Sequence, residues 1–286
     1  MTAPREKFFS MRWDIDHRAC ITDGLPRILR VCRQLGIRHT FFVNMGRSTN
    51  LREWLRGLAG TRARLRDTQA IHLIRKIGWP RFIAETVLAR PVGRSFIPAL
   101  ERVAAEGHEL GLHGASDHVV WSRRIDSVPE DVIAADLGET LGQFRHLFGR
   151  PAGFTSPGFR SDERITRMVE RFGFAYDGDA IGGRPHRPCH GGQPAQHWRI
   201  PVTICGQRTV PFLEWHGARS TPPQDILADF TGRLDGADWA VLYGHPCYEG
   251  VHEGLLRRVL QAVLERGFRF VTHRELAQRL CLGGLN

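Results

Sequence analysis

Short apolar runs alternate with stretches of helical periodicity along most of the chain. The apolar runs are short enough to be buried strands and lie at 8–14, 39–44, 108–113, 198–204, 239–245 and 268–273. Helical spacing of apolar residues follows at 24–35, 96–106, 130–148, 162–172, 225–234, 251–266 and in a last segment up to 282. This alternation is typical of βαβ units in a parallel sheet. The number of units predicts an α/β fold, a distorted (β/α)7-type barrel within a single domain at 1–286.

Polar residues stand where several of these strands end. Asp14 and Asp16, in "RWDIDHR", end the first run, His113 ends "ELGLH", and His245 ends "WAVLYGH". Because the carboxyl ends of parallel strands meet at one rim of a barrel, we expect these four side chains to converge.

The residue types at this rim suit metal-assisted hydrolysis of an amide or ester. An aspartate with two histidines is a common ligand set for a catalytic divalent ion and leaves a coordination position open. His118, in "HGASDH", supplies a further histidine, a second carboxylate can act as general base, and a distant histidine can protonate a leaving group. Each motif alone is weak; their shared position at strand ends strengthens the interpretation.

The basic charge of the chain is concentrated in one region. The formal net charge is +10, and residues 47–94 hold eleven basic residues against three acidic ones. Apolar residues at helical spacing are interleaved with the arginines, including Trp54 and Trp79, with Arg75 between them. We expect a basic amphipathic helical insert that binds an anionic membrane surface. A subdomain packed on the barrel with a solvated basic face is the alternative, and nucleic acid is disfavoured because no binding motif accompanies the charge.

Three features of the sequence indicate a cytoplasmic protein. No run of about 18 apolar residues exists to span a bilayer, and the N-terminal segment does not read as a secretion signal. The six cysteines show no CxxC spacing, so we expect reduced structural thiols. The expectation is a cytoplasmic protein, peripheral on the inner face of the cytoplasmic membrane, with no obligate protein partner.

Several motifs, in order along the chain, resemble those of the polysaccharide deacetylase family. They are "WDIDHR", "GIRHTFFVNMGR", "GHELGLHGASDHVVW", "SPGFRSDERI", "YDGD" and "LYGHPCYEG". Within that family the sequence is most similar to bacterial deformylases and deacetylases of undecaprenyl-phosphate-linked amino sugars, which share the DxD, the long segment before "HELGLH", and "IPVT".

The resemblance implies a role for each matching residue. Asp14 would be the general base, held ionised by Arg160, and His245 would be the general acid, oriented by Asp179. Asp16, His113 and His118 would bind one divalent metal ion, with Zn favoured and Mn, Co or Ni acceptable. Glu249 also matches a family position, and we place it, with Trp54, Trp79 and Arg75, among substrate- or membrane-binding residues, a surface carboxylate being the alternative.

One departure from the family pattern concerns the second ligand histidine. The family spaces its two histidines four apart, whereas His113 and His118 are five apart and Asp117 stands at the expected place. The spacing to Trp121 favours a one-residue insertion before His118, and Asp117 as ligand remains the alternative.

These roles predict a metal-dependent N-deacetylase of a polyprenyl-phosphate-linked N-acetylated amino sugar, used in lipopolysaccharide or lipid A modification. Alternatives are a deformylase of a lipid-linked formamido sugar, a soluble oligosaccharide deacetylase or amidohydrolase, and a catalytically silent membrane scaffold. One methyl group is worth only about 1–3 kcal/mol of discrimination in a pocket, so acetyl and formyl substrates are hard to separate from sequence.

Overall fold

A computed structural model describes residues 6–49, 51 and 73–283. Its strands are β1 (Lys7–Ile15), β2 (Thr40–Val43), β3 (Glu109–His113), β4 (Gly153–Thr155), β5 (Tyr176–Asp177), β6 (Cys189–His190), β7 (Gln193–Pro194), β8 (Trp198–Arg199), β9 (Trp239–Gly244) and β10 (Phe268–Phe270). Its α-helices are α1 (Leu25–Leu35), α3 (Leu73–Ile77), α4 (Trp79–Leu88), α5 (Ile97–Ala105), α6 (His118–Arg124), α7 (Glu130–Phe148), α8 (Glu163–Arg171), α9 (Phe212–Gly217), α10 (Pro223–Leu234), α11 (Pro246–Glu249), α12 (Glu253–Glu265) and α13 (His273–Cys281).

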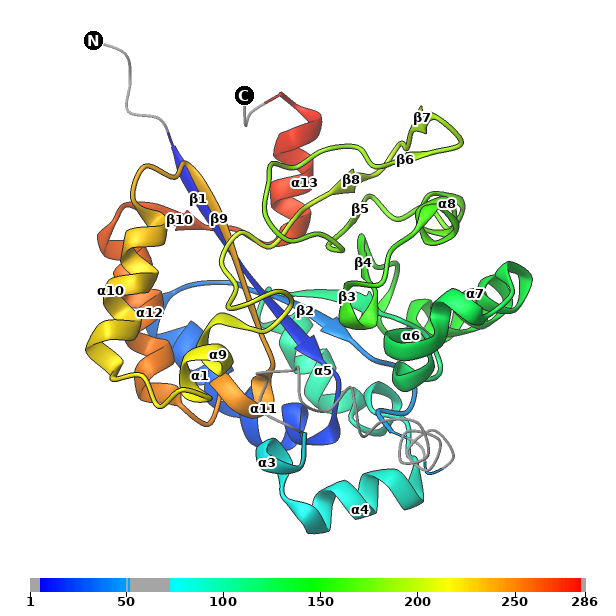
Figure 1. The fold of residues 1–286 in the computed structure, drawn as a ribbon, viewed down its shortest axis with the longest axis horizontal. Helices are drawn as coiled ribbons and strands as arrows, with labels where there is room; N and C mark the ends of the chain where they lie inside the picture. The colour runs from blue at the N-terminus through cyan, green and yellow to red at the C-terminus, as the bar shows by residue number, and fades with distance from the viewer. Residues whose placement is uncertain (1–5, 50, 52–72, 284–286) are drawn as a thin grey trace.

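The main sheet is parallel and curled. Its order is β10-β1-β2-β3-β4-β5-β8, with β9 also paired to β1 (Figure 1). Beyond β8 the chain bridges Ile204 to Leu242 of β9, and the amide of Thr203 donates to the carbonyl of Val241 over 3.0 Å. The sheet therefore curls back on itself, which confirms the α/β barrel-type fold that the alternating pattern predicted.

Two apolar clusters lie on the two faces of this sheet. Phe9, Met11, Trp13 and Ile15 of β1 pack in a large cluster with helix residues such as Ile28 of α1. The opposite face contributes a smaller cluster that includes Phe8, Phe42, Tyr176, Val241 and Tyr243. Because side chains alternate along a strand, Arg12 and Asp14 share the face of the smaller, enclosed cluster.

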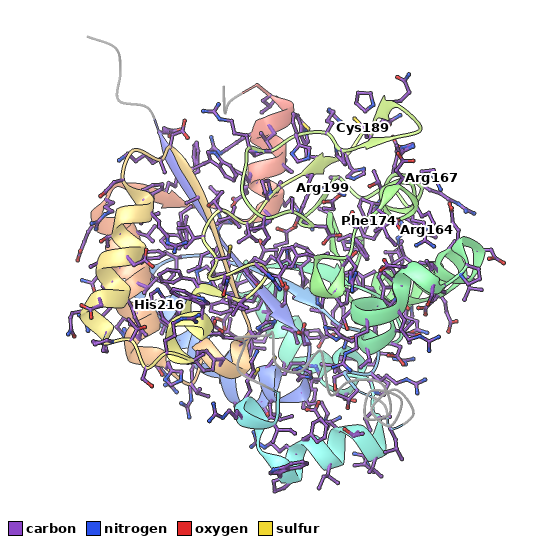
Figure 2. All side chains as sticks on the ribbon, in the orientation of Figure 1. Arg164, Arg167, Phe174, Cys189, Arg199 and His216 are labelled. Carbon is purple, nitrogen blue, oxygen red and sulfur yellow. The ribbon has the colours of Figure 1, made fainter. Side chains whose placement is uncertain are left out.

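The helices cover the outside of the sheet because they bury apolar faces against it. In α1 the buried residues are Leu25, Ile28, Leu29, Val31 and Cys32, which recur at helical spacing. Gly36 ends this helix in a left-handed conformation with φ 64°, which glycine adopts without steric cost. Figure 2 shows side chains filling the space between the helices and the sheet.

The runs at 198–204 and 268–273 were predicted as longer strands than the observed β8 and β10, and the first shows why. Regular pairing stops at Arg199, and Val202 and Ile204 form only isolated bridges. Pro201 explains the interruption because it has no amide proton to donate to a neighbouring strand.

Within the described part of the chain, no helix is long and apolar enough to cross a membrane. Residues 50 and 52–72 of the expected insert at 47–94, including Trp54, lie outside the described residues. The helices described within the insert are α3 and α4.

Candidate metal and catalytic site

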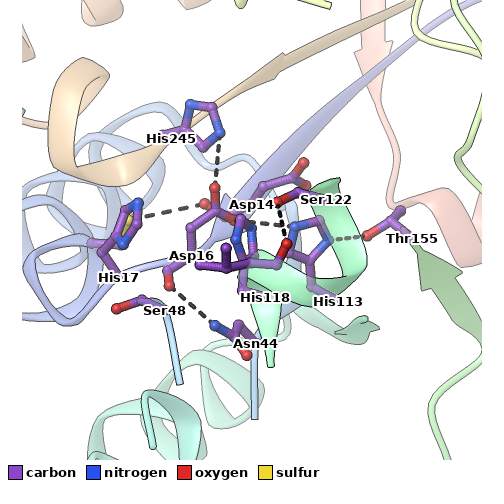
Figure 3. A network of polar contacts seen from close by, with 12 residues as sticks. Asp14, Asp16, His17, Asn44, Ser48, His113, His118, Ser122, Thr155 and His245 are labelled. Atoms are coloured by element: carbon purple, nitrogen blue, oxygen red, sulfur yellow. Dashed lines mark hydrogen bonds and ion pairs between the residues drawn. The ribbon is translucent and has the colours of Figure 1, made fainter. Parts of the chain in front are cut away.

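Asp16, His113 and His118 meet where β1 and β3 end (Figure 3). The Nε2 atoms of His113 and His118 lie 3.1 and 3.3 Å from Oδ1 of Asp16. One ligand atom from each residue falls within 4.8 Å of the other two. The structure thus brings together the three residues that the resemblance implied as ligands.

Asp117, the alternative ligand, has another task in the structure. Its carboxylate caps α6 by accepting the amides of Val119 and Val120 over 3.0 and 3.1 Å. The helix begins at His118, so the cap orients the first turn and directs the His118 imidazole toward Asp16.

The three residues fit a divalent ion by their unsatisfied atoms as well as by their types. Asp16 Oδ1 and His118 Nε2 are buried without a hydrogen-bond partner. Such atoms cost free energy unless something pairs with them, and a cation would satisfy both. Burial by itself would raise the pKa of Asp16, but the charges of His118 and His245 outweigh it and lower that pKa well below its usual range. His113 donates or accepts at Nδ1 with Thr155 Oγ1 over 2.7 Å, which holds its ring in place.

Asp14 lies beside this cluster and is held by an arginine of its own strand. Arg12 donates from Nε and Nη2 to the two carboxylate oxygens of Asp14, each over 2.7 Å. Both side chains are buried, and Arg12 Nη1 also donates to the carbonyl of Gly178 over 2.6 Å. Burial opposes ionisation of Asp14, but the Arg12 charge and that of His113 prevail and lower its pKa.

The expected pairing of Arg160 with Asp14 is wrong in this structure. Arg160 is exposed and its Nη1 lies 3.1 Å from Asp126, while its Nε donates to the carbonyl of Ser122. A residue two positions along β1 points to the same face as Asp14, so Arg12 reaches the carboxylate from within the strand. The alternation of the first run was the signal that could have identified Arg12.

His245 faces Asp16 from the other side of the cluster. Its Nε2 lies 3.3 Å from Asp16 Oδ2, and its Nδ1 lies 2.6 Å from Glu214 Oε1. Burial and Lys76 would lower the pKa of His245, but the carboxylates of Glu214 and Asp16 raise it well above its usual value. The imidazole is therefore stabilised in its protonated form, as a general acid requires.

The orienting carboxylate is Glu214 of α9; the expectation that Asp179 takes this part is wrong. Asp179 accepts the amide of Ser156 over 2.7 Å, and its amide donates to Asp177, which Arg199 also contacts. The sequence did not indicate Glu214, because it lies in the short helix α9, outside the motifs "YDGD" and "LYGHPCYEG". Only the tertiary fold brings α9 to His245.

Lys76 is, after Arg12 and Glu214, the third residue of the site that the sequence did not indicate. Its ammonium lies 2.6 Å from Glu214 Oε2 and 3.5 Å from His245 Nδ1, and its side chain is 11% exposed. Lys76 comes from α3, so the basic insert contributes a charge directly to the catalytic cluster.

The remaining predicted residues lie in different places. Glu249 is 1% exposed and accepts the amide of His245 over 2.8 Å, so it is not a surface carboxylate and does not reach a membrane. Trp79 is 57% exposed at the start of α4, and Arg75 is exposed on α3.

Comparisons with known proteins bear on both the fold and the family. No family model matches the sequence. The chain is 27% identical over 198 residues to a probable 4-deoxy-4-formamido-L-arabinose-phosphoundecaprenol deformylase of Shewanella sediminis. That match covers 68% of this chain and spans 62% of the relative's length.

Solved structures share the fold at low sequence identity. A Mycobacterium smegmatis protein assigned as a polysaccharide deacetylase superposes with a TM-score of 0.62 at 15% identity, covering 100% of this chain and 94% of that one. The chitin deacetylase of Colletotrichum lindemuthianum gives a TM-score of 0.56 at 14% identity, covering 94% and 87% of the two chains. The comparisons confirm the resemblance that the motifs indicated: this chain has the polysaccharide deacetylase fold and is similar in sequence to a lipid-linked sugar deformylase.

Proposed function

We propose that the protein is a metal-dependent N-deacetylase that acts on an N-acetylated amino sugar linked to a polyprenyl phosphate. The observation that carries the proposal is the Asp16, His113 and His118 cluster, flanked on one side by Asp14 and on the other by His245. Similarity to a deformylase and to deacetylase structures supports a hydrolase of amide bonds.

Two ionisable side chains have suitable settings for acid and base work. Asp14 is kept ionised by Arg12 and can accept the proton of an attacking water. His245 is kept protonated by Glu214 and can donate from Nε2 to the departing amine. The products are a free amino sugar and a carboxylic acid.

Asp16, His113 and His118 would hold the metal ion. The bound cation would polarise the amide carbonyl and stabilise negative charge that develops on its oxygen. An Asp/His₂ donor set suits Zn and also accepts Mn, Co or Ni. Thr155 and the Asp117 cap fix the two histidine rings.

The exposed face of α4 supports contact with a membrane. Its exposed positions are Trp79, Pro80, Arg81, Ile83, Ala84, Val87 and Leu88, of which only Arg81 is charged. Trp79, Ile83, Val87 and Leu88 are each more than half exposed, at 57%, 53%, 63% and 56%. A helix whose solvent face is apolar, in a segment rich in arginine, is typical of binding at an anionic bilayer interface. This face supports our proposal that the protein acts at the inner face of the cytoplasmic membrane, and we further propose a role in lipopolysaccharide or lipid A modification.

A deformylase is the second candidate, because the curated relative is named for a formamido sugar. The two activities differ by a methyl group at the carbonyl carbon, which a small pocket separates by about 1–3 kcal/mol.

The activity is tested by mass spectrometry of polyprenyl-phosphate-linked sugars, N-acetylated and N-formylated, incubated with the zinc-loaded protein. We expect loss of the acetyl group, sensitive to a chelator. Asp14→Asn should abolish turnover while zinc binding persists, and Asp126→Asn, a carboxylate exposed on the surface, should leave turnover unchanged. Loss of formyl alone would replace the deacetylase by the deformylase, and no change in either lipid would overturn both.

Membrane contact is tested separately by sedimentation with vesicles containing anionic phospholipid. The Ile83→Glu/Val87→Glu variant should lose binding. Val132→Glu is the matched control, since Val132 is also an exposed apolar residue, at 51%, but lies on α7. Equal sedimentation of all three proteins would exclude α4 as the contact surface.

A further inference from the structure

A cavity of about 320 Å³ lies between the start of the α1 region and α4. Its lining includes three arginines, Arg18 from the segment after β1 and Arg81 and Arg90 from α4 and the residues that follow it. Glu85 also lines it. Its carboxylate is engaged elsewhere, with Ser48 Oγ donating to it over 2.6 Å and His17 Nδ1 at 3.5 Å.

Two of the arginines have donors available for a ligand. Arg18 Nη1 is buried without a hydrogen-bond partner, although the guanidinium lies 4.7 Å from the centre of the Phe96 ring. Arg90 is exposed and has no ion pair among the described residues. Arg81 forms an ion pair with Asp23, which does not line the cavity. A buried donor without a partner is costly, so Arg18 indicates that an acceptor belongs in this cavity.

The cavity adjoins the metal and catalytic site. Arg18 follows the metal-ligand candidate Asp16 by two residues, and His17 between them contacts Glu85 of the cavity wall. The His17 ring centre lies 6.1 Å from that of His118. A ligand that occupied both the candidate metal site and this cavity would have its reacting group near Asp16 and an anionic group among the arginines.

Two residues of the exposed face of α4 also line the cavity. Ala84 and Leu88 line the cavity, and Leu88 is 56% exposed. A hydrocarbon chain attached to an anion in the cavity could therefore leave along the same surface that we propose for membrane contact.

We propose that this cavity is the binding site for the phosphate of the lipid-linked substrate, held by Arg18, Arg90 and Arg81. The inference rests on the proposed function and adds a recognition site for the substrate's anionic group. Guanidinium groups bind phosphate oxygens through paired, charge-assisted hydrogen bonds, and three of them around one cavity suit a phosphate ester.

Calorimetric titration of the zinc-loaded protein with inorganic phosphate and with geranyl phosphate tests the site without any turnover. We expect geranyl phosphate to bind more tightly than inorganic phosphate. Arg90→Ala and Arg18→Ala should each weaken binding by about ten-fold or more, as expected for a lost hydrogen bond to a charged group. Arg94→Ala is the matched control, because Arg94 is an exposed arginine of the same segment that does not line the cavity. Since Arg18 is partly buried, Arg90→Ala keeps the test decisive if Arg18→Ala does not fold.

Kinetics with the lipid-linked sugar then assign the site to the substrate. Arg90→Ala should raise KM about ten-fold with kcat little changed, and should not affect hydrolysis of the same sugar without its phosphate. Equal affinity for geranyl phosphate in wild type, Arg90→Ala and Arg94→Ala would overturn the site. Equal affinity for the two anions would assign it to free phosphate and overturn the lipid assignment. Loss of anion binding in Arg90→Ala, with no turnover of lipid-linked sugars by wild type, would retain an anion site and reject the proposed function.

Discussion

At the residue scale, the chemistry of the site depends on which charge each buried carboxylate contacts. Asp14 is paired with Arg12 by two hydrogen bonds, whereas Asp16 has the imidazoles of His113, His118 and His245 around it. The sequence indicated the two aspartates and the three histidines, because residue type and position at strand ends are local properties. It did not indicate Glu214, because a contact between residues 31 positions apart in sequence depends on the path of the chain.

Replacing Arg12 tests the partner of Asp14. Arg12→Lys keeps a positive charge but cannot make two parallel hydrogen bonds to Asp14 and also reach Gly178, so a buried carboxylate is left less well paired. We expect the free energy of unfolding to fall by about 1–3 kcal/mol in urea titrations, and kcat to fall with it. Arg160→Lys, on the exposed arginine first expected to pair with Asp14, should change stability by less than about 0.5 kcal/mol. The reverse order of effects would return the role to Arg160.

Asp179 gives a stability difference that depends on pH. Burial, followed by the nearby charge of Asp177, raises the pKa of Asp179 to about 7. The folded state therefore keeps this proton at pH values between about 3.9, the pKa in the unfolded chain, and about 7, the pKa in the folded state. Stability from this group is complete below the unfolded pKa and declines as pH rises through the folded one. Asp179→Asn, which can still accept the Ser156 amide, should therefore gain stability relative to wild type between pH 5 and pH 8, by about 1–3 kcal/mol in chemical unfolding. A difference that is the same at both pH values would contradict the raised pKa.

At the scale of elements, the loop after β9 is positioned by close backbone contact. A Cβ on Gly24 would lie 1.8 Å from the carbonyl oxygen of Pro246, the residue after His245. Gly24 is thus needed for the turn Cys20–Gly24 to pack against α11, which begins next to His245. Helical spacing in the sequence predicted α1 and α12, the helices that follow these two segments. It could not predict the contact between Gly24 and Pro246, because that contact depends on the tertiary fold.

Gly24→Ala should therefore destabilise the protein by about 1–3 kcal/mol and lower kcat, because overpacking displaces the His245 turn. Gly232→Ala is the control: Gly232 lies in α10 and a Cβ there meets nothing within 4 Å. That variant should gain about 0.5–1 kcal/mol, since alanine favours helix. Thermal unfolding of both variants measures their stability relative to wild type. Equal changes in stability would show that the close contact of Gly24 with Pro246 does not restrict residue 24 to glycine.

At the scale of the whole molecule, the curled sheet and the insert share the site. The candidate metal ligands follow β1, end β3 and begin α6, while His245 follows β9 and α3 of the insert adds Lys76 (Figure 1). The insert's α4 also borders the arginine cavity. The surface proposed for membrane contact, the proposed anion site and the proposed acid His245 thereby lie in one part of the fold.

Metal binding should stabilise the whole molecule, because the cation would pair with Asp16 Oδ1 and His118 Nε2, which are buried and make no hydrogen bond. At a zinc concentration about 100 times Kd, the gain is about 2.7 kcal/mol. Differential scanning calorimetry should show Tm rise by about 5 °C or more on adding zinc, and a chelator should reverse it. Asp16→Asn should lose most of this increase and Asp126→Asn should retain it. An increase that survives Asp16→Asn would place the ion elsewhere.

The sequence by itself predicted the α/β barrel and the candidate residues Asp14, Asp16, His113, His118 and His245, since periodicity and the parallel sheet follow from local pattern and chain direction. The tertiary structure decided the pairings among them. Arg12 displaced Arg160 because alternate residues of a strand share a face, and Glu214 displaced Asp179 because α9 packs beside His245. It also assembled the arginine cavity from Arg18, Arg81 and Arg90, whose proximity depends on how α4 lies against the turn after β1.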